Sequence, residues 1–270
     1  MEFKLILGYR CNLKCSYCYQ LKEHCNDKEM SYEIIDTFLK RYNKLKGSHS
    51  INFFGGEPLL YADKIKYIMD RVDKDRTSIS ISTNGSLRGT FYELQEYWGQ
   101  HSIGNLLSNK EHGDFTKLNE ESSFRYVVTK ENIDELTESK ITFLANHYKE
   151  KLQFKYDMSS KWELEHIQKM EHVQRILQGV LGSDFHIELP VDYNSKFVCF
   201  VSGTNCFINY NGDYLACHRN PNSKLGNIME EDFIYCKNEY CLDRCTNRPE
   251  NLYSYGKYEF KGVTLFHSCD

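Results

Sequence analysis

Three cysteines near the start of the chain could hold a metal ion or an iron–sulfur cluster. Cys11, Cys15 and Cys18 follow one another at the spacing C-x3-C-x2-C. Three thiolates on one short loop can face a single 4Fe–4S cluster, and they leave one of its four irons open to a small molecule. A structural zinc ion is the alternative, but zinc usually recruits a fourth ligand to close its tetrahedron.

Two further loops are expected to lie beside these cysteines. An apolar run at residues 3–7 predicts a strand just before the cysteine loop. Gly55-Gly56-Glu57-Pro58 follows a second predicted strand, and Asn84-Gly85 follows a third. The two adjacent glycines allow the backbone to approach a ligand closely. Because all three loops come just after strand ends, we expect them to form one site.

Apolar periodicity predicts strands that alternate with helices along the first two thirds of the chain. Such alternation is typical of parallel β/α units, and six units are too few to close an eight-stranded barrel. We therefore expect an α/β fold, a partial (β/α)6 barrel with its site at the carboxyl ends of the strands. The expected strands are 3–7, 50–54, 78–83, 102–107, 124–128 and 152–156, and the expected helices are 31–46, 62–72, 91–98, 131–149 and 161–178.

Composition narrows the class of protein. The chain has 270 residues, a net charge of −4 and 11 cysteines. The charge gives no overall attraction for nucleic acid, although it leaves a local basic patch open. We find no membrane-spanning run and no signal-peptide layout, so we expect a cytoplasmic protein with no membrane partner. In that setting cysteines are more often metal or cluster ligands than disulfides.

The motifs together resemble the radical S-adenosylmethionine (SAM) superfamily over roughly the first 180 residues. The resemblance rests on the cysteine spacing after a strand, the Cys18-Tyr19 pair and Gly55-Gly56-Glu57-Pro58 after the next strand. It implies a radical SAM barrel in which Cys11, Cys15 and Cys18 hold a catalytic 4Fe–4S cluster. It also implies that SAM binds the open iron and is cleaved to a 5′-deoxyadenosyl radical, which abstracts a hydrogen atom.

The resemblance further implies which residues contact SAM. Tyr17 would lie against the adenine, and the loop of Gly55, Gly56, Glu57 and Pro58 would meet the methionyl amino group, with Glu57 helping to hold that loop. Ser82 and Asn84 are candidates for the ribose or carboxylate, or else form a strand-ending turn. Arg125 could bind a carboxylate through two hydrogen bonds, or it could be a surface charge at a strand edge.

The character of the chain changes near residue 184, where regular periodicity fades. Seven of the cysteines follow, in a pattern that resembles the SPASM extension of radical SAM enzymes, so we expect domains at 1–184 and 185–270. The resemblance implies one or two auxiliary 4Fe–4S clusters; structural zinc is the alternative. The first cluster would use Cys199, Cys206, Cys217 and Cys245, and the second Cys236, Cys241 and Cys269 with Asp232 or an exogenous group, because Phe233 stands where a cysteine is expected.

His218 directly follows Cys217. In sulfatase-maturing relatives that position carries an aspartate used as a base. A histidine could serve as a catalytic acid or base, or it could be an ordinary surface histidine.

Three functions are compatible with these motifs. The first is a radical enzyme that cross-links, oxidises or epimerises a peptide or protein side chain, supplied with electrons by a donor such as flavodoxin or ferredoxin. The second is a radical enzyme that acts on a small molecule or nucleoside, for example an isomerase. The third is a non-catalytic metal-binding module, which the intact SAM motifs disfavour.

Overall fold

A mixed β-sheet forms the centre of the computed structural model, which describes residues 1–20, 23, 27–99, 103–108, 122–148, 152–157, 163–182, 205–218 and 222–235. The strand order within these residues is β6-β5-β4-β3-β2-β1-β7-β8-β9. Strands β1 to β7 pair in parallel, and β8 and β9 pair antiparallel. The strands are β1 (Glu2–Ile6), β2 (His49–Phe54), β3 (Thr77–Thr83), β4 (Ile103–Ser108), β5 (Ser122–Val128), β6 (Leu152–Tyr156), β7 (Asn205–Ile208), β8 (Asp213–Leu215) and β9 (Lys224–Asn227).

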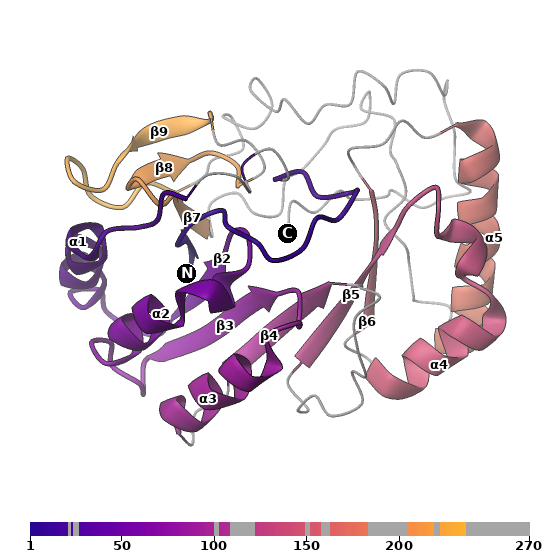
Figure 1. Cartoon of the computed structure of the whole chain (residues 1–270), viewed down its shortest axis with the longest axis horizontal. Helices are drawn as coiled ribbons and strands as arrows, with labels where there is room; N and C mark the ends of the chain where they lie inside the picture. The colour runs from indigo at the N-terminus through magenta and orange to yellow at the C-terminus, as the bar shows by residue number, and fades with distance from the viewer. Residues whose placement is uncertain are drawn as a thin grey trace.

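Helices lie along the outside of the curved sheet (Figure 1). Four of the five predicted helices are present within a few residues of their expected ends, and the fifth, 131–149, is divided. No helix in the described part of the chain is long and apolar enough to cross a membrane. The α-helices are α1 (Tyr32–Tyr42), α2 (Ala62–Met69), α3 (Arg88–Trp98), α4 (Glu138–Tyr148) and α5 (Leu164–Leu181), with short 3₁₀ helices η2 (Pro58–Tyr61) and η3 (Ile133–Glu135).

The predicted helix 131–149 is divided because Asn132 competes with the helical hydrogen bonds. Its side-chain oxygen accepts from Thr129 N at 2.7 Å, and its amide nitrogen donates to Val127 O at 3.0 Å. Short polar side chains that bind nearby backbone favour turns over helix interiors. A short 3₁₀ turn therefore comes first, and α4 begins only at Glu138.

The main core lies between the sheet and the helices. Alternate residues of a strand point to opposite faces, and Phe3, Leu5, Ile51 and Phe53 are all fully buried in the cluster that includes residues of α1 and α2. The opposite face carries polar side chains in the same strands. Lys4, Asn52 and Ser80 stand side by side across β1, β2 and β3. The α/β class is thus confirmed, with one apolar face and one partly polar face.

Strand β7 connects the two predicted domains within a single sheet. It pairs in parallel with β1, so that Glu2 lies beside Asn205 and Leu5 beside Ile208. Strands β8 and β9 extend the same sheet as an antiparallel ribbon. The predicted boundary at 184/185 stays a prediction, because the segment 183–204 lies outside the described residues. The strands at 205–227 nevertheless continue the sheet built by the first 156 residues.

Ser31 caps α1, and its replacement tests this helix. The Ser31 side chain accepts a hydrogen bond from Ile34 N at 3.3 Å. Ser31→Ala should lower the free energy of unfolding by about 1 kcal/mol, because one helix N–H group loses its partner. Urea unfolding measures this, with Ser31→Asp expected to retain the cap and Ser48→Ala as an exposed control outside any helix. Equal stability of the wild type and Ser31→Ala would contradict the assignment of this cap.

Candidate functional site

The three cysteines lie on the loop that leaves β1. Cys11, Cys15 and Cys18 are half-buried, and none of them forms a disulfide. The backbone N–H of Cys18 donates to the carbonyl of Cys15 at 3.0 Å, which places these two residues on one tight turn. None of the three thiols is enclosed in the core. The loop therefore presents three soft ligands at the carboxyl edge of the sheet.

Tyr17 lies among these thiols. Its pKa is raised well above the usual value, first by burial and then by the neighbouring Cys15 and Cys18. The phenol therefore stays protonated over the physiological pH range. Whether its ring contacts an adenine stays a prediction.

A buried carboxylate connects the cysteine loop to the two neighbouring loops. Glu57 is fully buried and accepts hydrogen bonds from Leu59 N at 3.0 Å, Thr83 Oγ1 at 2.8 Å and Asn84 N at 2.8 Å. Its own backbone N–H donates to the carbonyl of Arg10 at 2.8 Å. Glu57 thus holds together the start of η2, the end of β3 and the approach to Cys11.

The two glycines before Glu57 allow this loop to pack against the cysteine loop. A Cβ added at Gly56 would overlap the carbonyl oxygens of Tyr9 and Arg10, and one added at Gly55 would overlap that of Gly8. Gly55 also has φ +129°, which disfavours any residue with a side chain. The sequence suggested that these glycines make room for a ligand. In the structure they make room first for the backbone of the cysteine loop.

Asn84 joins the end of β3 to the first cysteine. Its amide nitrogen donates to Asn12 Oδ1 at 2.9 Å and lies 3.7 Å from Cys11 Sγ. The Asn12 amide in turn donates to Ser86 Oγ at 2.8 Å. The strand-ending turn is also present, with Gly85 at φ +73°. The turn interpretation of Asn84 therefore agrees with the structure, while a hydrogen bond from Asn84 to the ribose or carboxylate of SAM stays a prediction.

A row of polar side chains continues from this loop along the partly polar face of the sheet. Ser82 Oγ donates to Asn52 Oδ1 at 3.2 Å, and Asn52 Nδ2 donates to Ser80 Oγ at 2.6 Å. Strand pairing places the half-buried Arg125 on the same face, two strands away. Sequence reasoning missed Asn52. Its signal was a polar residue between the apolar Ile51 and Phe53 of one strand.

His218 is enclosed by aromatic rings. It is 2% exposed, and its ring centroid lies 5.0 Å from Phe54, 5.1 Å from Phe207 and 6.0 Å from Tyr19. The interpretation of His218 as a surface histidine is therefore wrong. Since Tyr19 directly follows Cys18, the imidazole lies next to the cysteine loop. Its role as an acid or base stays a prediction.

The structure describes three of the predicted auxiliary ligands. Cys206 is fully buried and Cys217 is 8% exposed, whereas the carboxylate of Asp232 is fully exposed and lies 3.5 Å from Arg41. Cys206 and Cys217 were predicted for the first cluster and Asp232 for the second, and both ligand sets stay predictions. The other predicted ligands, Cys199, Cys236, Cys241, Cys245 and Cys269, lie outside the described residues.

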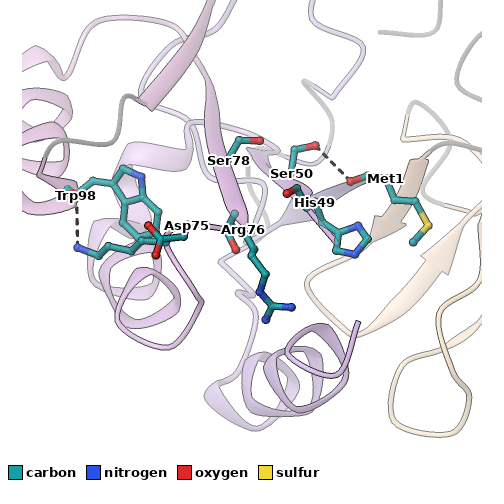
Figure 2. A pocket seen from close by; sticks show the side chains of 10 residues that line it. Met1, His49, Ser50, Asp75, Arg76, Ser78 and Trp98 are labelled. Atoms are coloured by element: carbon teal, nitrogen blue, oxygen red, sulfur yellow. Dashed lines mark hydrogen bonds between the residues drawn. The ribbon is translucent and has the colours of Figure 1, made fainter. Parts of the chain in front are cut away.

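A pocket of about 560 Å³ opens at the amino ends of β1, β2 and β3, the edge of the sheet opposite the cysteine loop (Figure 2). Its cations already have partners. Arg76 Nε lies 2.7 Å from an Asp73 carboxylate oxygen, and Lys74 Nζ donates to Trp98 O at 3.4 Å. No side chain that lines this pocket is as reactive as the three thiols at the opposite edge of the sheet.

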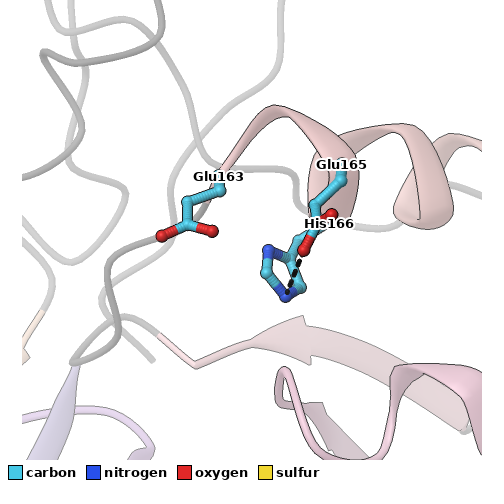
Figure 3. A group of neighbouring side chains, drawn as sticks. All are labelled: Glu163, Glu165 and His166. Carbon is cyan, nitrogen blue, oxygen red and sulfur yellow. Dashed lines mark ion pairs between the residues drawn. The ribbon is translucent and has the colours of Figure 1, made fainter.

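An acidic group at the start of α5 is the other candidate for a metal. Ligand atoms of Glu163, Glu165 and His166 lie within 4.8 Å of one another (Figure 3). Both glutamates are exposed, and Glu165 lies 3.7 Å from the imidazole of His166. Exposed acids of this kind are common on protein surfaces, so we assign no metal to them.

Comparison with known proteins supports the cysteine loop as the functional centre. The family model described as Radical SAM superfamily matches residues 5–143, which include all three loops of the site. A probable GTP 3′,8-cyclase of Methanocaldococcus jannaschii is 31% identical over 148 residues, which are 53% of this chain and 49% of that protein. The radical SAM cyclopropyl synthase TigE of Paramaledivibacter caminithermalis is 31% identical over 127 residues, 39% of this chain and 26% of that protein. The chain thus spans half or less of the length of these curated relatives.

Solved structures with a similar fold extend beyond the matched region. Native anSMEcpe with bound AdoMet and a Cp18Cys peptide has a TM-score of 0.59 at 16% identity, covering 94% of this chain and 82% of that one. Streptococcus suis SuiB bound to S-adenosylmethionine has a TM-score of 0.57 at 18% identity, covering 86% and 64%. At such identities the likeness concerns the fold alone.

Gly56 provides a test of the packing between the loops. Gly56→Ala should weaken iron binding by the cysteine loop and lower the thermal midpoint, because the new methyl group must displace the backbone of Tyr9 and Arg10 at a cost of about 1–3 kcal/mol. Gly89→Ala is the matched control, since a Cβ at Gly89 in α3 meets nothing within 4 Å. Iron content after anaerobic reconstitution and thermal unfolding measure both variants. Iron binding and stability unchanged in Gly56→Ala would show that the close packing is not needed.

Proposed function

Because the chain belongs to the radical SAM superfamily, we propose that it cleaves SAM reductively and uses the resulting 5′-deoxyadenosyl radical to abstract a hydrogen atom from its substrate. The observation that carries this proposal is the three-cysteine loop held in place by Glu57, Gly56 and Asn84. Three soft thiolates on one turn fit a 4Fe–4S cluster with one open iron better than a closed tetrahedral zinc site.

Each residue of the site has a role in this proposal. When bound, the cluster supplies the electron that breaks a carbon–sulfur bond of SAM and releases methionine. Cys11, Cys15 and Cys18 would hold the cluster. The Asn84 amide near Cys11 Sγ would donate a hydrogen bond to that sulfur and so tune the reduction potential of the cluster. Tyr17 would lie against the adenine, while the loop of Gly55-Gly56-Glu57-Pro58, the polar row at Ser82 and the Arg125 guanidinium would orient the polar groups of SAM.

We further propose that the substrate is a peptide or protein side chain, which the enzyme cross-links, oxidises or epimerises. Fold likeness to anSMEcpe, solved with a peptide, supports this. The His218 ring packs against aromatic rings beside the cysteine loop. Its imidazole could take a proton from the substrate radical or from the oxidised product. An electron donor such as flavodoxin or ferredoxin would reduce the cluster.

A nucleotide is the second candidate substrate. The proteins described as probable GTP 3′,8-cyclases share about 30–38% identity with this chain over 32–53% of its length, which is greater than the identity of the fold neighbours. The polar row of Asn52, Ser80 and Ser82 would suit a substrate with many hydrogen-bonding groups.

Auxiliary iron in the carboxyl-terminal part belongs to the same proposal. It would be held by cysteines among Cys199, Cys217, Cys236, Cys241, Cys245 and Cys269.

Removing the three thiolates tests the catalytic cluster. The variant Cys11→Ala, Cys15→Ala, Cys18→Ala should form no 5′-deoxyadenosine above background, because thiolate ligation is local to each cluster. Liquid chromatography with mass spectrometry measures the product after incubation with SAM and dithionite. Circular dichroism confirms that the variant is folded. Product formation at the wild-type rate would refute the assignment of these cysteines.

Deuterium transfer distinguishes the two substrate classes. The hydrogen abstracted from the substrate should appear in 5′-deoxyadenosine, so one incubation contains a deuterated peptide extract of cells and another contains deuterated GTP. We expect a mass increase of 5′-deoxyadenosine with the peptides and none with GTP. The reverse result would replace the peptide proposal by the nucleotide one. The rate of SAM cleavage, measured in parallel, reports on the radical chemistry independently of the substrate.

A further inference from the structure

The described residues of the carboxyl-terminal part form an apolar layer where the SPASM resemblance implies iron ligands. We infer that Cys206 is a structural residue of this layer, that Asp232 is a surface residue at its edge, and that neither ligates iron, so that the first auxiliary ligand set is not complete as the resemblance implies it and the second lacks its proposed carboxylate. This inference is independent of the proposed reaction, because it concerns only where the iron is held.

Cys206 lies on the face of the sheet that the helices cover. In β7 it stands beside Phe3 of β1, and the next residue on the same face, Ile208, stands beside Leu5. All four side chains are fully buried in the cluster that also contains Phe38 of α1. Burial raises the pKa of the Cys206 thiol far above its usual value. A thiol in such surroundings packs as a small apolar side chain and is not poised as a thiolate ligand.

Cys217 lies beyond the end of β8, outside the strands of the ribbon. Phe207 pairs with Leu215 across β7 and β8, and both pack with Ile6 and Tyr9 on the face away from the helices. Cys217 is two residues beyond Leu215, and its neighbour His218 packs against Phe207 on that same face. Because strand side chains alternate between faces, Phe207 and its partner Leu215 lie on the face opposite Cys206. A cluster bound to Cys206 would therefore have to lie inside the helix-covered core, where apolar side chains already pack.

The segment 228–235, here called the strap, covers Cys206 from outside. The ring of Phe233 lies 4.7 Å from that of Phe3 and 5.9 Å from that of Phe38. The backbone N–H of Ile234 forms a hydrogen bond to the Cys206 sulfur. Phe233 occupies the position where the resemblance leads one to expect a cysteine. Its packing against the aromatic rings of the core supplies the physical reason for the difference, since a partly buried apolar side chain is needed here.

Asp232 points the opposite way from Phe233. Its side chain is fully exposed, and its carboxylate lies 3.5 Å from Arg41 at the end of α1. The next side chain along the strap enters the core. Asp232 therefore lies on the protein surface, where the strap contacts the last turn of α1. A carboxylate held at this surface by an arginine is not positioned to replace a missing thiolate.

Substitution of Cys206 tests the inference in the full-length protein. Cys206→Val should keep the iron content and the electron paramagnetic resonance spectrum of the reduced wild type, because valine fills nearly the same apolar space. Asp232→Asn should also keep both. Cys11→Ala is the control for a ligand that does bind iron. Loss of about four irons per chain in folded Cys206→Val would overturn the inference, because a four-iron cluster would then depend on this thiol.

Alkylation of the wild type gives a second readout that needs no variant. After a chelator removes the iron under native conditions, iodoacetamide should modify Cys11, Cys15 and Cys18 within minutes, while Cys206 stays unmodified until urea is added. Peptide mass spectrometry follows each site. Modification of Cys206 as fast as the three loop cysteines would show that its thiol becomes accessible with loss of iron, and would likewise overturn the inference.

Discussion

The buried carboxylate of Glu57 is the interaction on which the site depends. It accepts hydrogen bonds from the start of η2 and from the end of β3, and its backbone N–H reaches the carbonyl of Arg10 in the cysteine loop. A buried carboxylate is stable only while its oxygens are satisfied. Loops from three different β/α units are therefore fixed relative to one another, and the three thiols take their position from a residue about 40 positions away in the sequence.

The two faces of the sheet differ in role: one is covered by helices and forms the core, and the other carries the polar side chains proposed to contact SAM. Phe3, Ile51 and Cys206 belong to the helix-covered layer, whereas Asn52 and Ser82 line the other face. Strand β7 contributes side chains to both faces. It also pairs with an edge of β1 that would otherwise be open to pairing with another chain. The ribbon β7–β9 and the strap therefore stabilise the strand from which the cysteine loop departs.

One fold of this kind supports several chemistries. The relatives by sequence are described as acting in GTP cyclisation or cyclopropyl synthesis, while fold neighbours include an enzyme solved with a bound peptide. Fold alone does not decide substrate, which is set by side chains around the reacting atoms. In this chain the distinctive groups near the cysteine loop are the enclosed imidazole of His218 and the polar row that includes Asn52.

The sequence by itself determined the features that depend on local order. The spacing of Cys11, Cys15 and Cys18 indicated a cluster loop, and apolar periodicity indicated the strands and helices. Only the tertiary structure decided the features that depend on distant contacts. These are the partners of Glu57, the backbone packing that requires Gly56, the burial of His218, and the burial of Cys206 in the helix-covered core. Spacing along a chain reports which residues are neighbours in sequence, whereas the face a side chain takes is set by strands that pair across 150 residues or more.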